Sequence, residues 1–460
     1  MDSFLIILII LITMLTINGY KVAKKDVENL NNLKARLTVK PYVPSVFVNP
    51  QFVTKYKIYN ETQDNIYIPK HFGIGEFGMY TSSTRDVKQT DDVFWEFAGK
   101  IRDGQIEVVD SFLKPEPHDG LICLQTGGGK TVCGLYIASQ LKLPTIVLVH
   151  NTFLRDQWIE RIKTFLPNAR IGLFQGETQQ IEDRDIIVGM LQTISMKELD
   201  IKTFKSIGLV IVDECHHIAS EAFSQAIPKL TSKYMLGLSA TPERKDRLMH
   251  VINWCLGPLL YKSDTSDKVD PGVFVEVYEF EEGDDEFNEI IYNKQGVMFT
   301  TLMINKLVIY ELRNKMIIDI LTDVYDDRTR QILVLSDRVD HVQLICDMLP
   351  ENIRNDACML SRKVDSKTRA EWCETKRILI ATYQMCKEGF DVPTLNTLLI
   401  ATPRPDVDQI VGRILRVERT KRKVSPLIVD IVDPAFRRQF QERLSLYKKR
   451  EYNVEKMKLN

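Results

Sequence analysis

Short, predominantly apolar segments recur along the chain, and each is followed by a segment long enough for a helix. They lie at 121–124, 145–149, 185–189, 209–212 and 234–238 in the first half, and at 332–335, 378–381, 397–400 and 427–431 in the second. Apolar strands separated by helices are typical of a parallel sheet that is covered on both faces. The two series therefore predict an α/β protein with two similar lobes, each built on a parallel sheet.

The segments outside these series predict the rest of the domain organisation. In residues 39–80, Val, Tyr, Phe and Ile alternate with proline and glycine, so we expect short strands and a small accessory domain at 21–97. The segment 263–310 is acidic and weakly periodic at its start, which predicts an interdomain linker or insertion. The first lobe is then expected at 98–262, and the second lobe, with a basic tail, at 311–460.

The segment GLICLQTGGGKTVCGLYIASQL, at 120–141, is the most informative one chemically. An apolar strand, a glycine-rich loop and a helical segment follow one another, which is the context of a phosphate-binding loop. Backbone N–H groups of the loop surround a triphosphate, the lysine reaches the outer phosphates, and the threonine hydroxyl binds Mg²⁺. We therefore predict ATP and Mg²⁺ as cofactors, bound by Gln125, Thr126, Gly127, Gly128, Gly129, Lys130 and Thr131.

Two further polar groups fit ATP hydrolysis. Asp213 and Glu214 follow the predicted strand 209–212, where Asp213 can hold Mg²⁺ and Glu214 can polarise the attacking water. In the second lobe, the segment QIVGRILR places Gln409, Arg413 and Arg416 at i, i+4 and i+7, which predicts one face of a helix. Such arginines can act as fingers across a cleft, and a solvated basic face is the alternative.

Taken together, these segments resemble the superfamily 2 helicases of the DEAD/DEAH type. LQTGGGKT, DECHH, LSATPERKDRL, ILIATYQMCKEGFDVP and QIVGRILR are similar to motifs I, II, III, V and VI of that family. VLVHNTFLRDQW is similar to motif Ia, and GMLQTI to the nucleic-acid-contact motif that follows it. DECHH, SATPERKD and LSDR look most like the branch of large DNA viruses and phages, which is related to repair and transcript-release helicases.

The resemblance covers about residues 101–417 and carries expectations for the fold and for single residues. It implies two tandem RecA-like lobes with an ATP cleft between them. It places Arg102 and Gln105 where the family recognises adenine. It assigns the coupling of hydrolysis to strand movement to His216, Ser239, Thr241, Gly389 and Asp391.

Three functional hypotheses remain open on the sequence. The leading one is an ATP-dependent helicase or translocase that acts on DNA in viral repair, transcription or replication, with an RNA helicase or transcript-release factor as its alternative. A membrane-anchored P-loop enzyme with a small-molecule substrate explains fewer motifs, because it leaves Ser-Ala-Thr, motif V and QIVGRILR unused. A catalytically idle scaffold does not explain why Lys130, Asp213, Glu214 and Arg416 are all present.

Charge and cysteine usage add two expectations. The whole chain has a formal charge of −1, but residues 401–460 carry 15 Lys+Arg against 8 Asp+Glu, a net +7. The basic segment 437–458 therefore predicts either a nucleic-acid contact or a solvated helical face. The 8 cysteines contain no CxxC pair, which is typical of a reducing compartment and of a protein without structural zinc.

The first 20 residues are dominated by the apolar run Phe4–Ile17. As a helix this run is about 21 Å long, shorter than the ~30 Å hydrocarbon core of a bilayer. Lysines at 21, 24 and 25 favour a membrane anchor with the bulk of the chain in the cytoplasm. A buried strand and a misassigned start codon are the alternatives. We expect the protein inside the host cell, in the cytoplasm or the virion, with or without a membrane tether.

Overall fold

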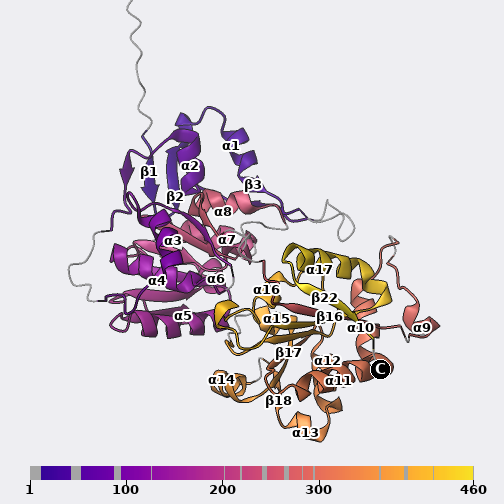
Figure 1. Ribbon diagram of the computed structural model, residues 1–460. Helices are drawn as coiled ribbons and strands as arrows, with labels where there is room; N and C mark the ends of the chain where they lie inside the picture. The colour runs from indigo at the N-terminus through magenta and orange to yellow at the C-terminus, as the bar shows by residue number, and fades with distance from the viewer. Residues whose placement is uncertain are drawn as a thin grey trace, which may run out of the picture. The chain divides into compact units, whose positions relative to one another are not determined.

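The computed structural model describes residues 12–42, 53–87, 95–125, 127–200, 202–217, 220–240, 246–263, 269–281, 283–293, 296–361, 364–387, 392–417 and 419–458. The chain forms two compact units, Met1–Ser263 and Asp264–Asn460 (Figure 1).

The first unit is built on an eight-stranded sheet with the strand order β11-β10-β12-β9-β13-β14-β8-β15. All neighbouring strands are parallel except β10 and β11. The strands are β8 (Gly120–Cys123), β9 (Thr145–Val149), β10 (Ile171–Gln175), β11 (Thr178–Gln179), β12 (Ile186–Met190), β13 (Leu209–Val212), β14 (Tyr234–Ser239) and β15 (Leu259–Lys262). The five strands predicted for this half are confirmed to within one residue at each end.

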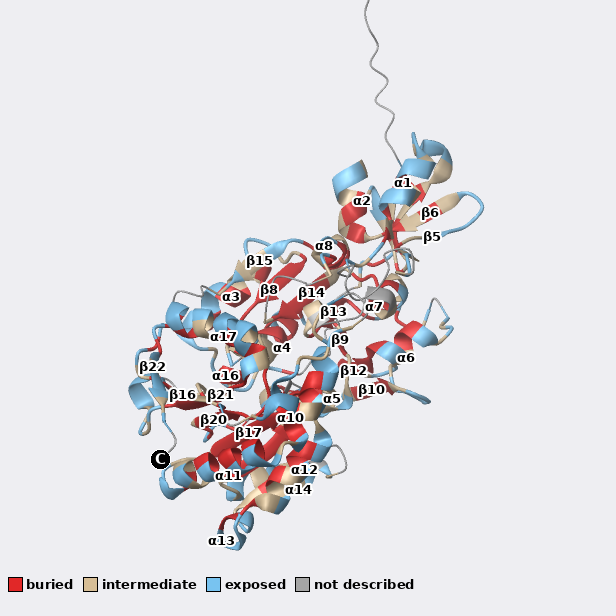
Figure 2. Ribbon diagram, turned by 90° about the vertical axis from the view of Figure 1, so that its right-hand side faces the viewer, coloured by how far each residue is buried: buried red, intermediate tan, exposed pale blue. Residues whose placement is uncertain are grey.

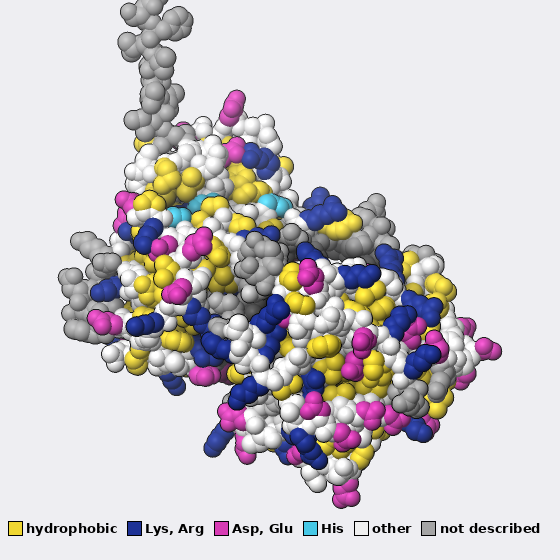
Figure 3. All heavy atoms as spheres, viewed as in Figure 1, with side chains coloured by type: hydrophobic (Ala, Val, Ile, Leu, Met, Phe, Trp, Pro, Cys, Tyr) yellow, Lys and Arg dark blue, Asp and Glu magenta, His cyan; other side chains and the backbone are white. Residues whose placement is uncertain are grey.

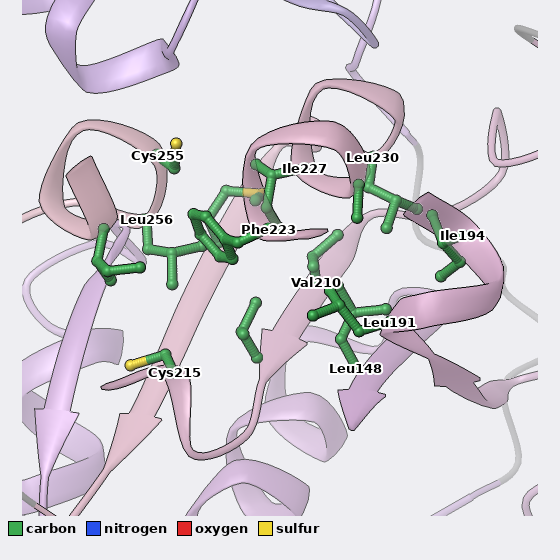
Figure 4. Close-up of a cluster of buried hydrophobic side chains, with 14 of the residues drawn as sticks. Leu148, Leu191, Ile194, Val210, Cys215, Phe223, Ile227, Leu230, Cys255 and Leu256 are labelled. Carbon is green, nitrogen blue, oxygen red and sulfur yellow. The ribbon is translucent and has the colours of Figure 1, made fainter. Parts of the chain in front are cut away.

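Helices cover both faces of this sheet. Successive residues of a strand point to opposite faces, and here both sets of side chains are apolar and need a covering layer. Leu121 belongs to one buried cluster and Ile122 to the other. One face is covered by α3 (Asp103–Leu113), α4 (Lys130–Leu141) and α5 (Thr152–Phe165), and the other by α6 (Leu191–Met196), α7 (Ser220–Ala226) and α8 (Met249–Leu256). Figure 4 shows the core that α6, α7 and α8 cover. Figure 2 shows how burial is concentrated in the strands.

The N-terminal residues form a small sheet with the order β5-β6-β2-β1-β7. Its elements, with the two-stranded β3-β4 and two helices, are β1 (Met14–Thr16), β2 (Gly19–Ala23), α1 (Leu30–Arg36), β3 (Thr38–Val39), β4 (Tyr56–Lys57), β5 (Asn60–Glu61), β6 (Asn65–Ile68), α2 (Lys70–Phe77) and β7 (Ser82–Ser83). The predicted short strands of the accessory region are therefore present, together with two helices that the sequence analysis did not predict.

The prediction of one apolar helix over Phe4–Ile17 is wrong for the last residues of this segment. Met14–Thr16 form β1, which pairs with β2 and β7, and Leu15 and Ile17 are buried in unit 1. The apolar side chains are used for packing in the fold, as the buried-strand alternative expects. Residues 4–11 lie outside the described residues, and none of the described helices is long and apolar enough to cross a membrane.

Two buried cations hold the N-terminal region to the large sheet. Lys70 lies 2.7 Å from the carboxylate of Asp119, and both side chains are almost fully buried. The guanidinium of Arg85, 2% exposed, donates four hydrogen bonds of 2.7 to 3.1 Å to the carbonyl oxygens of Phe204, Lys205, Ile207 and Thr231. These carbonyls precede β13 and β14, so the accessory region is attached at the amino ends of central strands.

The second unit is built on a fully parallel seven-stranded sheet with the order β18-β19-β17-β20-β21-β16-β22. Its strands are β16 (Phe274–Glu279), β17 (Ile332–Ser336), β18 (Ala357–Leu360), β19 (Ile378–Thr382), β20 (Thr397–Ile400), β21 (Leu427–Val432) and β22 (Asn453–Met457). Its helices are α9 (Asp285–Asn288), α10 (Thr300–Ile309), α11 (Glu311–Asp326), α12 (Val339–Met348), α13 (Glu351–Arg354), α14 (Ser366–Thr375), α15 (Tyr383–Lys387), α16 (Asp408–Val411) and α17 (Arg437–Lys449). The four strands predicted for this half are confirmed.

The predicted linker at 263–310 is wrong in part, because it contains β16. This strand pairs with β21 on one side and β22 on the other, and Val275 and Val277 are buried. The segment FVEVYE alternates apolar and acidic residues, so its strand signal was hidden by the acidic composition around it. The second lobe therefore begins well before residue 311.

The basic C-terminus is also part of the fold. Arg443 of α17 is buried against Asp430 of β21, and Arg450 lies 2.7 Å from Asp408. Lys456, in β22, lies 2.6 Å from Glu279 of β16. Figure 3 shows Lys and Arg interspersed with Asp and Glu over the second unit in this view. Arg437, Arg438, Lys448 and Lys449 are exposed, so a solvated helical face describes this segment in part, and a nucleic-acid contact there stays a prediction.

Candidate ATP site

The loop between β8 and α4 has the backbone geometry of a phosphate-binding loop. Gly127 and Gly129 both have a φ angle of +84°, and Gly129 directly precedes α4. The positive φ angle favours glycine at position 129, and a Cβ there would lie 2.1 Å from the Nε2 atom of Gln105, so that side chain would have to move. Lys130 and Thr131 open the helix, as the sequence predicts. Thr126 lies outside the described residues.

The rest of the loop is held by neighbouring backbone and side-chain groups. The backbone N–H of Gly128 donates to the carbonyl of Gln125 at 3.0 Å, and the N–H of Gln125 donates to Ser263 Oγ at 3.3 Å. Gln105 donates from Nε2 to the carbonyl of Gly128 at 3.2 Å and accepts from the backbone N–H of Arg102 at 2.9 Å. Gln105 thus lies against the loop, and its role in adenine recognition stays a prediction.

Asp213 and Glu214 lie at the carboxyl end of β13, two strands away from β8 in the same sheet. Lys130 Nζ lies 2.9 Å from Glu214 Oε1, which joins the phosphate-binding loop to the acidic pair. Glu214 has a φ angle of +47°, a conformation that costs a non-glycine residue about 1–2 kcal/mol. The next residue, Cys215, is fully buried in the core of Figure 4 and anchors this turn.

Asp213 is 4% exposed, and protein donors reach both of its carboxylate oxygens. Trp158 Nε1 donates to Oδ2 at 2.7 Å, and the backbone N–H of Glu214 donates to Oδ1 at 3.0 Å. Burial, followed by the negative charge of Glu214, raises the pKa of Asp213, while Lys130 opposes the shift. A divalent cation at this carboxylate would relieve that cost.

The donor set fits Mg²⁺ bound together with phosphate. Thr131 and Asp213 supply a hydroxyl and a carboxylate oxygen, which are the hard ligands that Mg²⁺ prefers. No group of three or more His, Cys, Asp and Glu residues that could hold a metal ion occurs in the described part of the chain. Mg²⁺ sites in nucleotide hydrolases commonly use only one or two protein ligands, with phosphate and water completing the shell.

His216 and Ser239 meet beside the acidic pair. His216 Nδ1 lies 2.7 Å from Ser239 Oγ and 3.4 Å from Glu214 Oε2. Ser239 is the last residue of β14, so this contact joins the loop after β13 to the end of the adjacent strand. The family resemblance assigns both residues to the coupling of hydrolysis to strand movement, but it does not predict that they contact each other. Thr241, which belongs to the same assignment, lies outside the described residues.

The predicted helical face of QIVGRILR is wrong in its geometry. Helix α16 ends at Val411, and the chain continues in tighter turns in which the N–H of Arg413 donates to Ile410 O at 2.9 Å. Ile410 and Ile414 are buried beneath the turn, which fixes its path. Gln409, Arg413 and Arg416 are all half-buried. They belong to the second unit, so their action at Lys130 and Glu214 stays a prediction, and Gly389 and Asp391 lie outside the described residues.

The two segments that resemble nucleic-acid-contact motifs are joined to each other. The side chain of Asn151 caps α5 by accepting from the N–H of Leu154 at 2.8 Å. Gln192, at the start of α6, donates to the carbonyl of His150 at 2.8 Å. The loop after β9 and the start of α6, which follows β12, therefore form one local structure at the carboxyl edge of the sheet.

Trp158 is the residue at this site that the sequence analysis missed. It lies in α5, four residues from both Leu154 and Ile162, and this spacing predicts only a buried position in the core. Its indole N–H nevertheless points at Asp213, which is 55 residues away in sequence. A sequence alone gives no signal for a hydrogen bond of that range.

Comparison with known proteins decides the family. The family described as "Type III restriction enzyme, res subunit" matches residues 98–244. The protein named "Putative ATP-dependent RNA helicase L396" of Acanthamoeba polyphaga mimivirus is 30% identical over 469 residues, covering 96% of this chain and 86% of the relative. The chain belongs to the superfamily 2 helicases. It is therefore an ATP-hydrolysing enzyme that acts on nucleic acid, which confirms the predicted enzyme class.

Two further comparisons concern a shorter segment and the fold. The protein named "DNA 3'-5' translocase XPB2" of Sulfurisphaera tokodaii is 34% identical to the helicase over 168 residues, which is 36% of this chain and 37% of the relative. The structure of S. cerevisiae Dbp5 bound to RNA and ADP BeF3 covers 78% of the helicase and 90% of its own chain, with a TM-score of 0.54 and 16% identity. This likeness, with the two parallel sheets, confirms the predicted fold of tandem RecA-like lobes.

Proposed function

We propose that this helicase is a Mg²⁺- and ATP-driven motor that moves on DNA. The observation that carries the proposal is the contact of 2.9 Å between Lys130 and Glu214, with the buried Asp213 beside them at the carboxyl edge of one sheet. Ligands of parallel α/β sheets bind at this edge. A lysine, a metal-binding carboxylate and a second carboxylate for the water are the groups that phosphoryl transfer to water requires.

Each group has a distinct part in this proposal. Lys130 neutralises charge on the outer phosphates, and Thr131 and Asp213 hold Mg²⁺, which supplies further charge neutralisation when it is bound. Glu214 orients the attacking water and accepts its proton. The strained backbone of Glu214 supports this role, since conformations of this kind cluster at active sites. From the second lobe, Gln409, Arg413 and Arg416 complete the site, with Arg416 as the arginine finger.

DNA is the nucleic acid on which we propose that the helicase moves, and RNA is the alternative. The DNA proposal is supported by the segment shared with a relative named as a DNA translocase, and by the DECHH and LSDR motifs. The alternative is supported by the longer match to a relative named as an RNA helicase. The proposed setting is repair, transcription or replication of a large DNA virus, inside the host cell or the virion.

ATPase turnover with different nucleic acids tests this proposal. The full chain is assayed with Mg²⁺-ATP alone and with single-stranded DNA, duplex DNA and RNA of matched sequence. We expect DNA to raise turnover more than RNA does. Greater stimulation by RNA would replace the DNA proposal by its alternative. Turnover that no nucleic acid changes would contradict a nucleic-acid motor and reopen the small-molecule enzyme.

A further inference from the structure

Trp158 connects three elements of the helicase at one buried point. Its indole N–H donates to Asp213 Oδ2 at 2.7 Å, and the two residues are 0% and 4% exposed. The other carboxylate oxygen, Oδ1, accepts from the backbone N–H of Glu214. The two bonds together fix the plane of the Asp213 carboxylate, as groups that orient a metal ligand do.

The same indole ring packs against the helix that follows the phosphate-binding loop. A Cβ on Gly134 of α4 would lie 3.3 Å from Trp158 Cη2, so the ring reaches the backbone of that helix. Gly134 is four residues, about 6 Å along the helix axis, from Lys130. Any shift of the Trp158 ring therefore acts on both Asp213 and the helix that carries Lys130.

Helix α5 carries Trp158 and begins at the loop that resembles motif Ia. Asn151 caps its first turn, and the preceding carbonyl of His150 is held by Gln192. Asn151 and Trp158 are seven residues apart, so about 10 Å of helix separates the loop from the indole. A helix of this length moves as a rigid body, because every turn is held by backbone hydrogen bonds.

We propose that Trp158 is a positioning residue that transmits nucleic-acid binding at the start of α5 to the carboxylate of Asp213. The inference rests on the proposed function. Burial alone predicts some hydrogen-bond partner for a tryptophan N–H, but it does not select the carboxylate of Asp213 as that partner. Trp95 shows the difference, since it is 1% exposed in the same core, yet its indole nitrogen has no hydrogen-bond partner among the described residues.

The test is Trp158→Phe, which keeps an aromatic ring in the core and removes the N–H donor, with Trp95→Phe as the matched control. ATPase turnover of the full chain is measured with and without DNA over a range of Mg²⁺ concentrations. We expect Trp158→Phe to lower DNA-stimulated turnover about tenfold, the lower end for losing a hydrogen bond to a charged group. The ratio of DNA-stimulated to basal turnover should fall, DNA affinity should change far less, the Mg²⁺ requirement should rise, and Trp95→Phe should alter none of these.

A rescue variant separates the N–H from the packing. In Trp158→His, the imidazole Nε2 can occupy the position of the indole Nε1, because the two five-membered rings superpose. We expect this variant to recover part of the stimulation that Trp158→Phe loses, measured per folded molecule after a thermal unfolding check. Equal stimulation in the Phe and His variants would show that the N–H is not the coupling group and would overturn the proposal.

Fluorescence tests the same link without hydrolysis. The Trp158 signal is taken as the difference between the wild-type chain and Trp158→Phe, and DNA is added without ATP. We expect this difference signal to change on DNA binding. An unchanged signal, or a Trp158→Phe variant that loses basal and stimulated turnover by the same factor, would assign Trp158 a structural role only. If the wild-type chain itself responds to no DNA or RNA, the proposed function fails instead.

Discussion

Protonation of the buried His341 should make the second lobe sensitive to mild acid. His341 is 1% exposed, and its Nδ1 and Nε2 atoms lie 2.8 Å from Ser336 Oγ and 2.9 Å from Asn314 Oδ1. Burial, with a smaller contribution from the Arg313 charge, lowers the pKa of His341 from 6.5 to about 3. The folded protein therefore keeps this imidazole neutral at pH values where the unfolded chain protonates it.

The sign and size follow from proton linkage. Between pH 6.5 and about 3 the unfolded state binds more protons, so the free energy of unfolding rises with pH in this window. The contribution of His341 is fully present above pH 6.5 and is lost as the pH falls towards 3. One pKa unit corresponds to about 1.4 kcal/mol, so lowering the pH from 7 to 5 should destabilise the second lobe by about 2 kcal/mol.

Thermal unfolding of the wild-type chain and of His341→Gln between pH 5 and 7.5 measures this effect. The variant removes the titrating group, so its melting temperature should fall less steeply with acid than that of the wild type. The carboxylates are common to both proteins and cancel in the comparison. Parallel pH profiles for the two proteins would refute the reasoning and would place the pKa of His341 in the folded protein near its usual value.

Three other changes have defined outcomes. Arg416→Ala should cut ATPase turnover by about 10³-fold or more with little change in melting temperature, and loss of folding with residual activity intact would make Arg416 structural. Arg85→Met should lower the melting temperature far more than Arg36→Met, because the exposed ion pair of Arg36 contributes only about 0–1 kcal/mol. Equal effects would contradict the claim that Arg85 holds the N-terminal region to the large sheet. Truncation before Arg437 should unfold the second lobe, whereas Lys448→Glu should not, as circular dichroism would show.

The strands were predictable because burial on both faces of a parallel sheet leaves a continuous apolar run. Strands β9, β13, β17 and β20 consist of Val, Ile and Leu, apart from one Thr or Ser at an end of β9, β17 and β20, and all of their residues are buried. Strand β16 was not predictable in this way, because its acidic residues alternate with the buried Val275 and Val277. Residues 14–17 were ambiguous because an apolar segment of that length fits a strand, a buried helix or a membrane segment equally well.

The candidate site was predictable where the chemistry lies within one motif. Gly129, Lys130 and Glu214 are recognised from their local spacing, and the structure places Lys130 against Glu214. Contacts between distant segments were not predictable, as for Trp158 with Asp213. The turn that carries Arg413 shows a related limit, since helical spacing does not reveal where the hydrogen bonding tightens and α16 ends.

The central claim is that Glu214 activates water for hydrolysis while Lys130 and the glycine-rich loop hold the phosphates. Turnover and ATP affinity of Glu214→Gln test it most directly, because the amide keeps the shape of the side chain and cannot accept the proton. We expect ATP to bind with nearly unchanged affinity and turnover to fall by about 10²- to 10⁴-fold, with or without DNA. Turnover close to that of the wild type would contradict the claim.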